Sequence, residues 1–348
     1  MEKQLKTRSN EISSNRVASF IEKFLPHSLS EQIKKTRNGV RYIKGNFSDL
    51  RNNIRDMNTS DERKILFNVL IDTHIIEKGL SHESIRYNFG KEPLKRLAKN
   101  LNILIVNKMT DTEEFKYAIS TLSGYYELHL DSHIDIANFI QTMDKNLMFY
   151  IKNNPDNYGG SFIIDRNLKK NNKKKSYKEL VENRFTIRNF ENSEVLNSQI
   201  TQIIKMATKS PSACNRQSTR VVVVRSESII KQVLEVQGGF RGYVLPSVLL
   251  ATVVDMRAYS NYTDRNMAYV DGGLFTMSIV YGIEYEGLGA CLLNTSFTNK
   301  KERTIRKLLQ MNKSERFIAI IAIGNLKEKN YVAKSHRMDP TEITRIIE

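Results

Sequence analysis

The sequence predicts an α+β fold that is preceded by a mainly α-helical N-terminal domain. Up to about residue 165, apolar residues recur every three or four positions, which is the spacing of amphipathic helices. Later in the chain, helical segments alternate with short β-branched runs, as expected for a sheet covered by helices. We therefore expect a helical domain over residues 1–165, a basic linker over 166–175 and a sheet-containing domain over 176–348.

Length and composition narrow the class of protein. A chain of 348 residues is long enough for two domains. The two cysteines, Cys214 and Cys291, provide neither a disulfide framework nor a zinc-binding spacing, which favours a reducing cytoplasm. Residues 1–16 have no apolar run typical of a signal peptide, and the apolar stretch 243–254 is too short to span a membrane. We expect a cytoplasmic protein without a membrane span.

The formal net charge of +16 comes partly from one run of residues. Five lysines and two asparagines lie within residues 169–175, and such a block of like charges is usually a solvated linker. Nucleic-acid binding requires basic residues interleaved with aromatic ones or a recognisable reading motif, and the sequence shows neither. The charge therefore favours solubility and attraction of anions over nucleic-acid binding.

Four amphipathic helices are predicted in the N-terminal domain. The first begins with a capping box of Thr59 and Glu62 and ends at Gly79 as a C-cap. The other three are expected to begin near Pro93, at a capping box starting with Asp111, and near Ile134.

Helices and strands alternate in the C-terminal domain. Apolar spacing predicts helices and β-branched or apolar runs predict strands. The expected elements are a helix over 198–207 capped by Ser198, a strand over 221–224, a helix over 228–236, a strand over 247–254, a central helix over 267–286, a strand over 290–293, a helix capped by Asn299 and a last strand over 317–323.

Three segments carry side chains that could bind a ligand. In "RFTIRNF", residues 184–190, an extended chain would place Arg184, Thr186 and Arg188 on one face as a phosphate clamp; a solvent-facing strand edge is the alternative. The tail "AKSHRMD" carries Lys334 and Arg337, which at a chain end are usually solvated.

The third segment is "SPSACNRQ", residues 210–217. Ser212, Asn215 and Gln217 offer uncharged donors and acceptors, which suit the edge of a planar ligand better than a phosphate. A simple turn is the alternative, because proline, serine and asparagine favour turns for local reasons. Cys214 has no histidine near it in the sequence, which disfavours a nucleophilic role.

The order of these segments resembles the nitroreductase family of FMN-dependent oxidoreductases. "RFTIRNF", then "PSACNRQ" before a valine strand, "VLPSVLLATVVD", "EGLGACLL" and "IAIGNLKEKNYVAKSHR" follow in the family's order over residues 176–348. The resemblance implies a nitroreductase-like sheet flanked by helices, FMN bound at the interface of a homodimer, NAD(P)H as electron donor and a small organic acceptor. It implies no metal and no catalytic side chain, since the flavin carries the chemistry.

The resemblance also implies roles for individual residues. Arg184 and Thr186 would hold the ribityl-phosphate end of FMN, with further phosphate contacts from Lys334 and Arg337. Arg188 would lie near the flavin N1/O2 edge, where reduction places negative charge. The three polar residues of the 210–217 loop would approach the ring from the second subunit: Ser212, Asn215 and Gln217.

This sequence departs from the family pattern at several positions. Thr186 replaces the usual serine but keeps its hydroxyl group. Ser218 and Thr219 occupy the positions where Pro-Trp is common, and the segment before the central helix is short. The sequence therefore does not predict the identity of the electron acceptor. The alternatives to a NAD(P)H-dependent enzyme are a flavin oxidase or dehydrogenase acting on a biosynthetic intermediate, and a non-enzymatic dimeric scaffold that has lost flavin.

The N-terminal domain lies outside the resemblance to the FMN-binding half. Its most distinctive segment is "THIIEKGLS", in which His74, Glu77 and Lys78 lie within about one helical turn. It looks like the extension on some nitroreductase-like proteins associated with cell-surface polysaccharide genes. The three residues could contact a substrate or the flavin domain; a capped helix end is the alternative.

Overall fold

The computed structural model describes residues 26–53, 60–259, 262–264 and 266–348. The chain divides into two compact units. The smaller unit comprises residues 1–54 and 257–268 and contains helix α2 (His27–Asn53) and the short 3₁₀ turn η5 (Tyr262–Asp264). In this unit the Arg41 guanidinium lies over the Tyr262 ring, 5.2 Å from its centroid. The larger unit comprises residues 55–256 and 269–348 and carries every predicted site residue.

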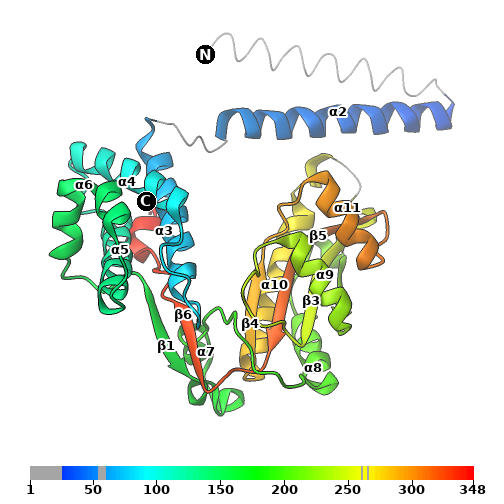
Figure 1. Ribbon diagram of the computed structural model, residues 1–348. Coiled ribbons are helices and arrows are strands. Elements are labelled where there is room, and N and C mark those ends of the chain that lie inside the picture. Colours follow the sequence, from blue (N-terminus) through cyan, green and yellow to red (C-terminus); the bar gives the residue numbers. More distant parts are fainter. Residues whose placement is uncertain (1–25, 54–59, 260–261, 265) are drawn as a thin grey trace, which may run out of the picture. The chain divides into compact units, whose positions relative to one another are not determined.

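The larger unit begins with a helical bundle, as the apolar spacing predicts. Helices α3 (Glu62–Leu80), α4 (Lys91–Val106), α5 (Glu113–Asp131) and α6 (Ala137–Lys152) enclose one apolar core (Figure 1). Val69, Leu97 and Leu122 are fully buried in it. The helices are therefore held by burial of one apolar stripe each rather than by helix propensity alone.

The helix ends of the bundle differ from the predicted caps. Asp61, not Thr59, caps α3 by accepting a hydrogen bond from the Lys64 amide, and Thr59 lies outside the described residues. Ser81 rather than Gly79 is the C-cap of α3. Thr112 rather than Asp111 caps α5. Aspartate and threonine also cap helices well, so the composition of these segments does not distinguish neighbouring candidates.

A four-stranded antiparallel sheet forms the centre of the C-terminal part. Its strands are β2 (Thr219–Val224), β3 (Val248–Asp255), β5 (Glu315–Gly324) and β4 (Gly289–Leu293), in the order β2-β3-β5-β4. Val222 lies opposite Ala251, and Leu250 lies opposite Ile321. All four predicted strands are therefore present, and the α+β fold class is confirmed.

Helices cover both faces of this sheet. Successive residues of β3 enter different cores: Leu250 packs with Ile203 and Ile279, whereas Leu249 packs with Val233 and Ile305. Helices α8 (Asn197–Ala207) and α10 (Met267–Tyr285) thus cover one face, and α9 (Glu227–Gln237) and α11 (Asn299–Leu308) cover the other (Figure 1). Burial on both faces explains why β3 reads as a continuous apolar run.

Three features of the C-terminal part differ from the prediction. A two-stranded sheet was not predicted: β1 (Ser161–Asp165) lies at the end of the predicted helical region, and its partner β6 (Lys329–Ala333) follows the strand expected to be the last. Helix α8 begins after Leu196 rather than Ser198, and Thr298 rather than Asn299 caps α11. The remaining helices are short: α7 (Tyr177–Glu182) and α12 (Pro340–Ile343).

The lysine-rich run is not uniformly solvated. It forms the 3₁₀ turns η1 (Arg166–Lys169) and η2 (Asn172–Lys174), in which Lys169 and Asn172 are buried. Lys169 pairs with Glu284 of α10, and both side chains are 3% exposed. The neighbouring Lys170, Lys173 and Lys174 are exposed, as a run of like charges predicts.

Candidate functional site

The 210–217 loop is fastened to the central helix α10. The Ser210 hydroxyl donates to the Ser278 hydroxyl at 2.6 Å, and the Ala213 amide donates to the Asp271 carboxylate at 3.0 Å. Within the loop, the Gln217 amide donates to the Ser212 hydroxyl at 3.0 Å. These contacts hold the loop in one conformation, which a simple turn between a helix and a strand does not require.

The backbone of this loop is strained. Cys214, Asn215 and Gln217 have φ angles of 53°, 54° and 47°, in the left-handed region that favours glycine. Each such conformation costs on the order of 1 kcal/mol for a residue with a β-carbon. Backbone of this kind occurs at ligand-binding sites and also in local turns, so both interpretations of the loop stay open.

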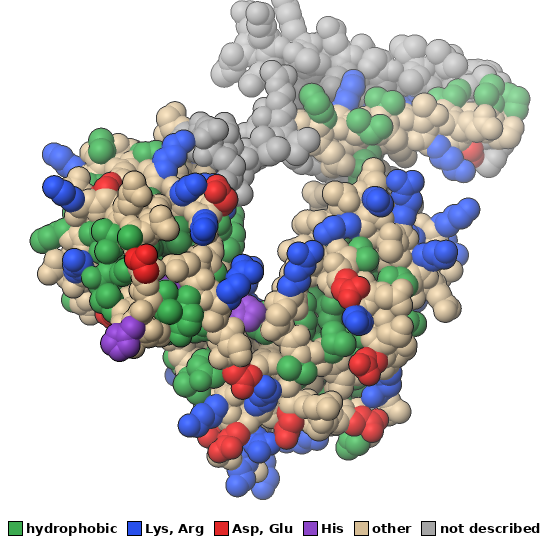
Figure 2. Space-filling view, in the orientation of Figure 1, with side chains coloured by type: hydrophobic (Ala, Val, Ile, Leu, Met, Phe, Trp, Pro, Cys, Tyr) green, Lys and Arg blue, Asp and Glu red, His purple; other side chains and the backbone are tan. Residues whose placement is uncertain are grey.

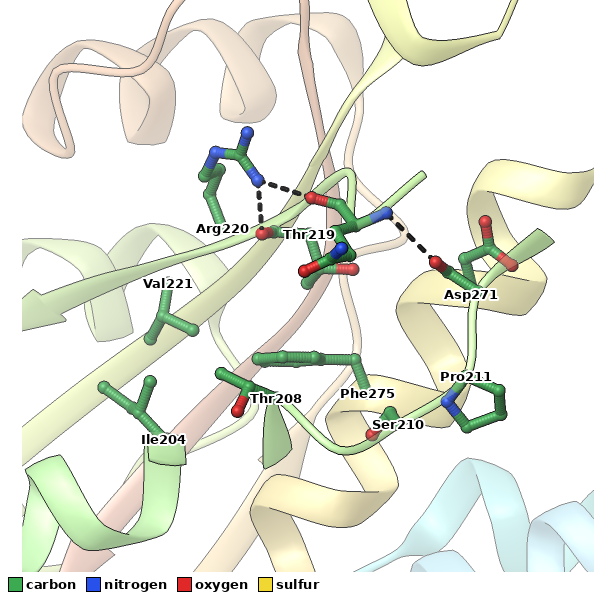
Figure 3. Close-up of a pocket in the computed structure, with 11 residues that line it drawn as sticks. Ile204, Thr208, Ser210, Pro211, Thr219, Arg220, Val221, Asp271 and Phe275 are labelled. Carbon is green, nitrogen blue, oxygen red and sulfur yellow. Dashed lines mark hydrogen bonds between the residues drawn. The ribbon is translucent and has the colours of Figure 1, made fainter. Parts of the chain in front are cut away.

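A cavity of about 340 Å³ lies between the loop, α8, α10 and β2. The Phe275 ring lies between the apolar side chains of Ile204 and Val221 and the backbone at Ser210 (Figure 3). Polar groups come from Ser212, Gln217, Arg220 and Asp271. A mainly apolar cavity with a few fixed polar groups is typical of a site for a planar organic molecule.

Helix α10 contributes to this cavity, which the sequence had not led us to predict. Asp271 and Phe275 are four residues apart, so they lie on the same face of the helix. The signal was present, because Asp271 is one of only two acidic residues, with Glu284, in the mainly apolar segment that forms α10. Of the two glycines beside it, Gly272 packs tightly against Ile318, whereas Gly273 faces open space.

The predicted arginine segment runs along the edge of the sheet beside β4. Thr186 forms a bridge with Ala290, and the Ile187 amide donates to the Ala290 carbonyl at 2.9 Å. Ile187 is buried in the core, while Arg184 and Thr186 are half-buried. The segment is extended at Thr186, but Ile187 and Arg188 are both buried, so burial does not alternate along it as the prediction assumed.

Arg337 lies close enough to Arg184 to affect its pKa. Burial lowers the pKa of Arg184, and the positive charge of Arg337 lowers it further. Lys334 lies in the same tail, and burial lowers its pKa too, partly offset by the Glu77 carboxylate. Its ammonium group donates to the Asn157 carbonyl oxygen at 3.1 Å. Neighbouring guanidinium groups such as Arg184 and Arg337 can bind an anion through charged hydrogen bonds.

Arg188 is the most buried residue of the predicted set. Its side chain is 8% exposed, and its Nη1 has no hydrogen-bond partner among the described residues. A buried donor without a partner costs about 1–3 kcal/mol, and more when it is charged. This guanidinium therefore has an unused donor for a ligand.

The two predicted groups of residues do not meet within one chain. Ser212 and Gln217 line the α10 cavity, and Asn215 belongs to the same loop. None of the predicted cations, Arg184, Arg188, Lys334 and Arg337, lines that cavity. The predicted site residues therefore fall into two separate groups, called the two half-sites below.

Helix α3 links the helical bundle to the C-terminal tail through Glu77. This carboxylate is fully buried and accepts hydrogen bonds from the Tyr117 hydroxyl at 2.5 Å, the Gly160 amide at 3.0 Å and the Ser335 amide at 3.2 Å. His74 lies 3.4 Å away. Burial and the adjacent carboxylate raise the pKa of Tyr117 far above its ordinary value, so the hydroxyl remains a donor. Of the alternatives for His74, Glu77 and Lys78, contact with the C-terminal part describes Glu77 better than a simple helix end.

Among the residues that the structure describes, no group of three or more His, Cys, Asp or Glu side chains could hold a metal ion. The described helices also include none that is long and apolar enough to cross a membrane.

Comparison with known proteins identifies relatives for the C-terminal half. Residues 181–240 match the model of the Nitroreductase family. A protein of Archaeoglobus fulgidus described as "Putative NADH dehydrogenase/NAD(P)H nitroreductase" is 25% identical over 168 residues, which cover 48% of this chain and 95% of that protein.

Two solved structures illustrate the same similarity. A nitroreductase family protein from Clostridium novyi NT is 20% identical, with a TM-score of 0.39 and coverage of 44% of this chain and 87% of its own. A nitroreductase-like protein from Streptococcus mutans is 18% identical, with a TM-score of 0.43 and coverage of 49% and 98%. Together with the motifs, the matching family model and the archaeal relative confirm the predicted resemblance of the C-terminal half of this chain to the nitroreductase family.

Proposed function

We propose that this protein is an FMN-dependent oxidoreductase that transfers electrons from NAD(P)H to a small organic acceptor. The comparisons support a general oxidoreductase role. The observation that carries the FMN proposal is the buried guanidinium of Arg188, whose Nη1 lacks a partner among the described residues and which lies on the segment that matches the family motif. A flavin carbonyl edge is an acceptor that would satisfy this donor.

Each predicted residue would contact a particular part of FMN. Arg184 and Arg337, which lie close to each other, would hold the phosphate, with Lys334 beside them. The Thr186 hydroxyl would contact the ribityl end. Arg188 would lie at the N1/O2 edge, where its fixed charge stabilises the negative charge of the reduced ring. FMN, when bound, supplies the two-electron chemistry that no side chain can supply.

The two half-sites support a homodimer as the active form. Helix α10 exposes apolar side chains at helical spacing: Val270, Leu274 and Met277 are 48%, 46% and 39% exposed. The 210–217 loop is fastened to the same helix. A two-fold contact through α10 would cover these side chains and bring Ser212, Asn215 and Gln217 of one subunit toward the arginine segment of the other, forming two identical sites.

Flavin binding tests the proposal directly. Purified protein should be yellow or should quench the fluorescence of added FMN, and Arg184→Ala should weaken FMN binding much more than His74→Ala. Colourless protein that ignores micromolar FMN would contradict the proposal and favour the scaffold alternative. Equal effects of the two substitutions would contradict the site assignment.

The dimer and the electron donor need separate measurements. Leu274→Glu places a charge on the exposed apolar face of α10, so it should produce monomers in analytical ultracentrifugation and weaken FMN binding at the same time. A monomeric variant that binds FMN normally would contradict the shared site. Anaerobic mixing with NADH or NADPH should bleach the flavin; no bleaching with either favours an enzyme that oxidises a biosynthetic intermediate.

A further inference from the structure

A second, larger cavity lies where the helical bundle meets the C-terminal part. It measures about 600 Å³ and is bordered by the end of α3, the 82–90 segment that follows, Arg188, and the 238–243 loop after α9. Its volume is in the range of cavities that hold small organic ligands. Lys and Arg side chains stand on both sides of the hollow in this face of the molecule (Figure 2).

The charged side chains that line this basic cavity are all cationic. Lys78, Arg86, Arg188 and Arg241 contribute four cationic groups, and His82 contributes a fifth group that can be charged. No Asp or Glu is among the described residues that line it. A concave surface with one sign of charge concentrates ions of the opposite sign.

The cations in the cavity destabilise one another in the absence of an anion. Burial lowers the pKa of Lys78, and the charge of Arg188 lowers it further. The pKa of His82 is lowered by the same two causes in the same order. An anion bound among these groups would offset the repulsion between their like charges and would favour their charged forms.

Arg188 connects this cavity to the proposed flavin site, and its unpaired donor is the one assigned there to the flavin, so the proposal for this cavity rests on its shape and its cationic lining. The Arg188 side chain is more than nine-tenths buried, it lines the cavity, and its Nη1 has no hydrogen-bond partner among the described residues. Native proteins rarely leave a buried guanidinium donor unpaired.

The wall of the cavity is built from both halves of the protein. The His82 and Tyr243 rings are stacked, with centroids 3.9 Å apart and an interplanar angle of 12°. The Tyr243 hydroxyl donates to the Lys78 carbonyl at 3.4 Å. Residues of the helical bundle and of the 238–243 loop therefore hold each other in place, so the cavity needs little rearrangement to bind.

We propose that the basic cavity binds a small polyanion, bearing phosphoryl or clustered carboxylate groups, and that the helical half thereby supplies substrate recognition. Arg188 lines this cavity and also belongs to the proposed flavin site, so a ligand here would lie next to the flavin. The assignment of this ligand as the substrate rests on the proposed function; the binding of a polyanion does not.

The test uses inorganic pyrophosphate and citrate as probes, titrated calorimetrically into the full-length protein saturated with FMN at constant ionic strength. The variants are Arg86→Gln and Arg241→Gln, both exposed cavity residues that can be replaced without disturbing the core. The matched control is Arg345→Gln, which removes the same charge from an exposed position outside the cavity.

We expect at least one probe to bind the wild-type protein, and each cavity variant to raise its Kd about 10-fold or more, because a charged hydrogen bond is lost. The control should leave the Kd unchanged. Tighter binding of pyrophosphate assigns phosphoryl groups, and tighter binding of citrate assigns carboxylates. Thermal unfolding of each variant verifies that it is folded.

Three results would overturn the proposal: no binding of either probe, equal Kd values for cavity and control variants, or displacement of FMN by the probe, which would make the cavity part of the cofactor's phosphate site. Failure of the proposed function looks different. In that case FMN does not bind, while probe binding to the FMN-free protein still depends on Arg86 and Arg241.

Discussion

Replacing Lys169 by methionine is expected to lower the free energy of unfolding by about 3–5 kcal/mol. The Lys169 ammonium lies 2.6 Å and 2.8 Å from the two carboxylate oxygens of Glu284, and it also donates to the Asn183 carbonyl oxygen. Both members of the pair are 3% exposed. Methionine keeps most of the alkyl chain, so the loss reports the missing charge rather than a cavity.

The magnitude follows from what remains after the substitution. Glu284 would keep one side-chain hydrogen bond, from the Asn172 amide at 3.0 Å, and no opposite charge in direct contact among the described residues. Removing one partner of a buried ion pair leaves an uncompensated charge, whereas removing both is often nearly neutral. The double variant Lys169→Met/Glu284→Gln should therefore recover most of the lost stability.

The loss of unfolding free energy in Lys169→Met should also depend on pH. Burial raises the pKa of the Glu284 carboxyl group and lowers that of the Lys169 ammonium group. A carboxyl whose pKa is higher in the folded than in the unfolded protein contributes stability below its ordinary value of 4.5, and that contribution is lost as the pH rises through the folded pKa. Removing Lys169 raises the folded pKa further, so the Lys169→Met defect should shrink as the pH falls toward 4.5.

Urea denaturation followed by circular dichroism measures these free energies. The matched control is Lys170→Met, because Lys170 is the next residue and is exposed; its effect should stay within about 0.5 kcal/mol. If Lys169→Met and Lys170→Met behave alike, the lysine-rich run is solvated throughout and the reasoning is refuted.

Five further substitutions probe the backbone and the bundle. Gly159→Ala should lower the free energy of unfolding by about 1–3 kcal/mol, because the new β-carbon would lie 2.5 Å from the Tyr117 backbone oxygen. Gly124→Ala changes a helical position that faces open space, so it should raise the free energy of unfolding by about 0.5–1 kcal/mol in the same urea assay. Glu77→Ala should cost at least about 2 kcal/mol and speed proteolysis of the C-terminal tail, since buried donors lose their acceptor; unchanged cleavage would contradict this. Cys214→Gly should leave thermal stability equal or higher by up to about 1 kcal/mol, while Cys214→Val should lower it, because φ is +53° there; the opposite order would count against strain in the loop.

The elements of this fold are readable from the sequence because their signals are local. The run of four valines lies in β2, and the apolar run 247–254 corresponds to β3. The apolar segment beginning at Met267 forms α10. The periods of helices and strands depend only on residues a few positions apart, so one sequence is sufficient to detect them.

The exact helix caps were less predictable. Asp61 caps α3, for which the sequence predicted Thr59. Thr112 caps α5, for which it predicted Asp111. Several residues of similar capping strength lie next to each other at these helix ends, and the choice among them depends on where packing of the apolar face begins.

The residues of the candidate site could be predicted from the sequence, but their arrangement in space could not. The order of the motifs in the sequence is sufficient to indicate Arg184, Arg188 and the 210–217 loop, because those residue types and their spacing carry the nitroreductase resemblance. Their placement in two half-sites, and the share of α10 in one of them, depend on how distant segments pack.

The main helices, the four strands of the central sheet, the α+β class and the resemblance of the C-terminal half to the nitroreductase family could be read from the sequence, since each depends on short-range patterns. Which charges are buried, and which cations lie near one another, depends on the tertiary structure. Strand β1 pairs with β6 across more than 160 residues of chain. The Glu77 carboxylate accepts a hydrogen bond from the Ser335 amide, and Lys169 forms a buried ion pair with Glu284. Contacts of this range depend on the packing of the whole chain, which local periodicity does not encode.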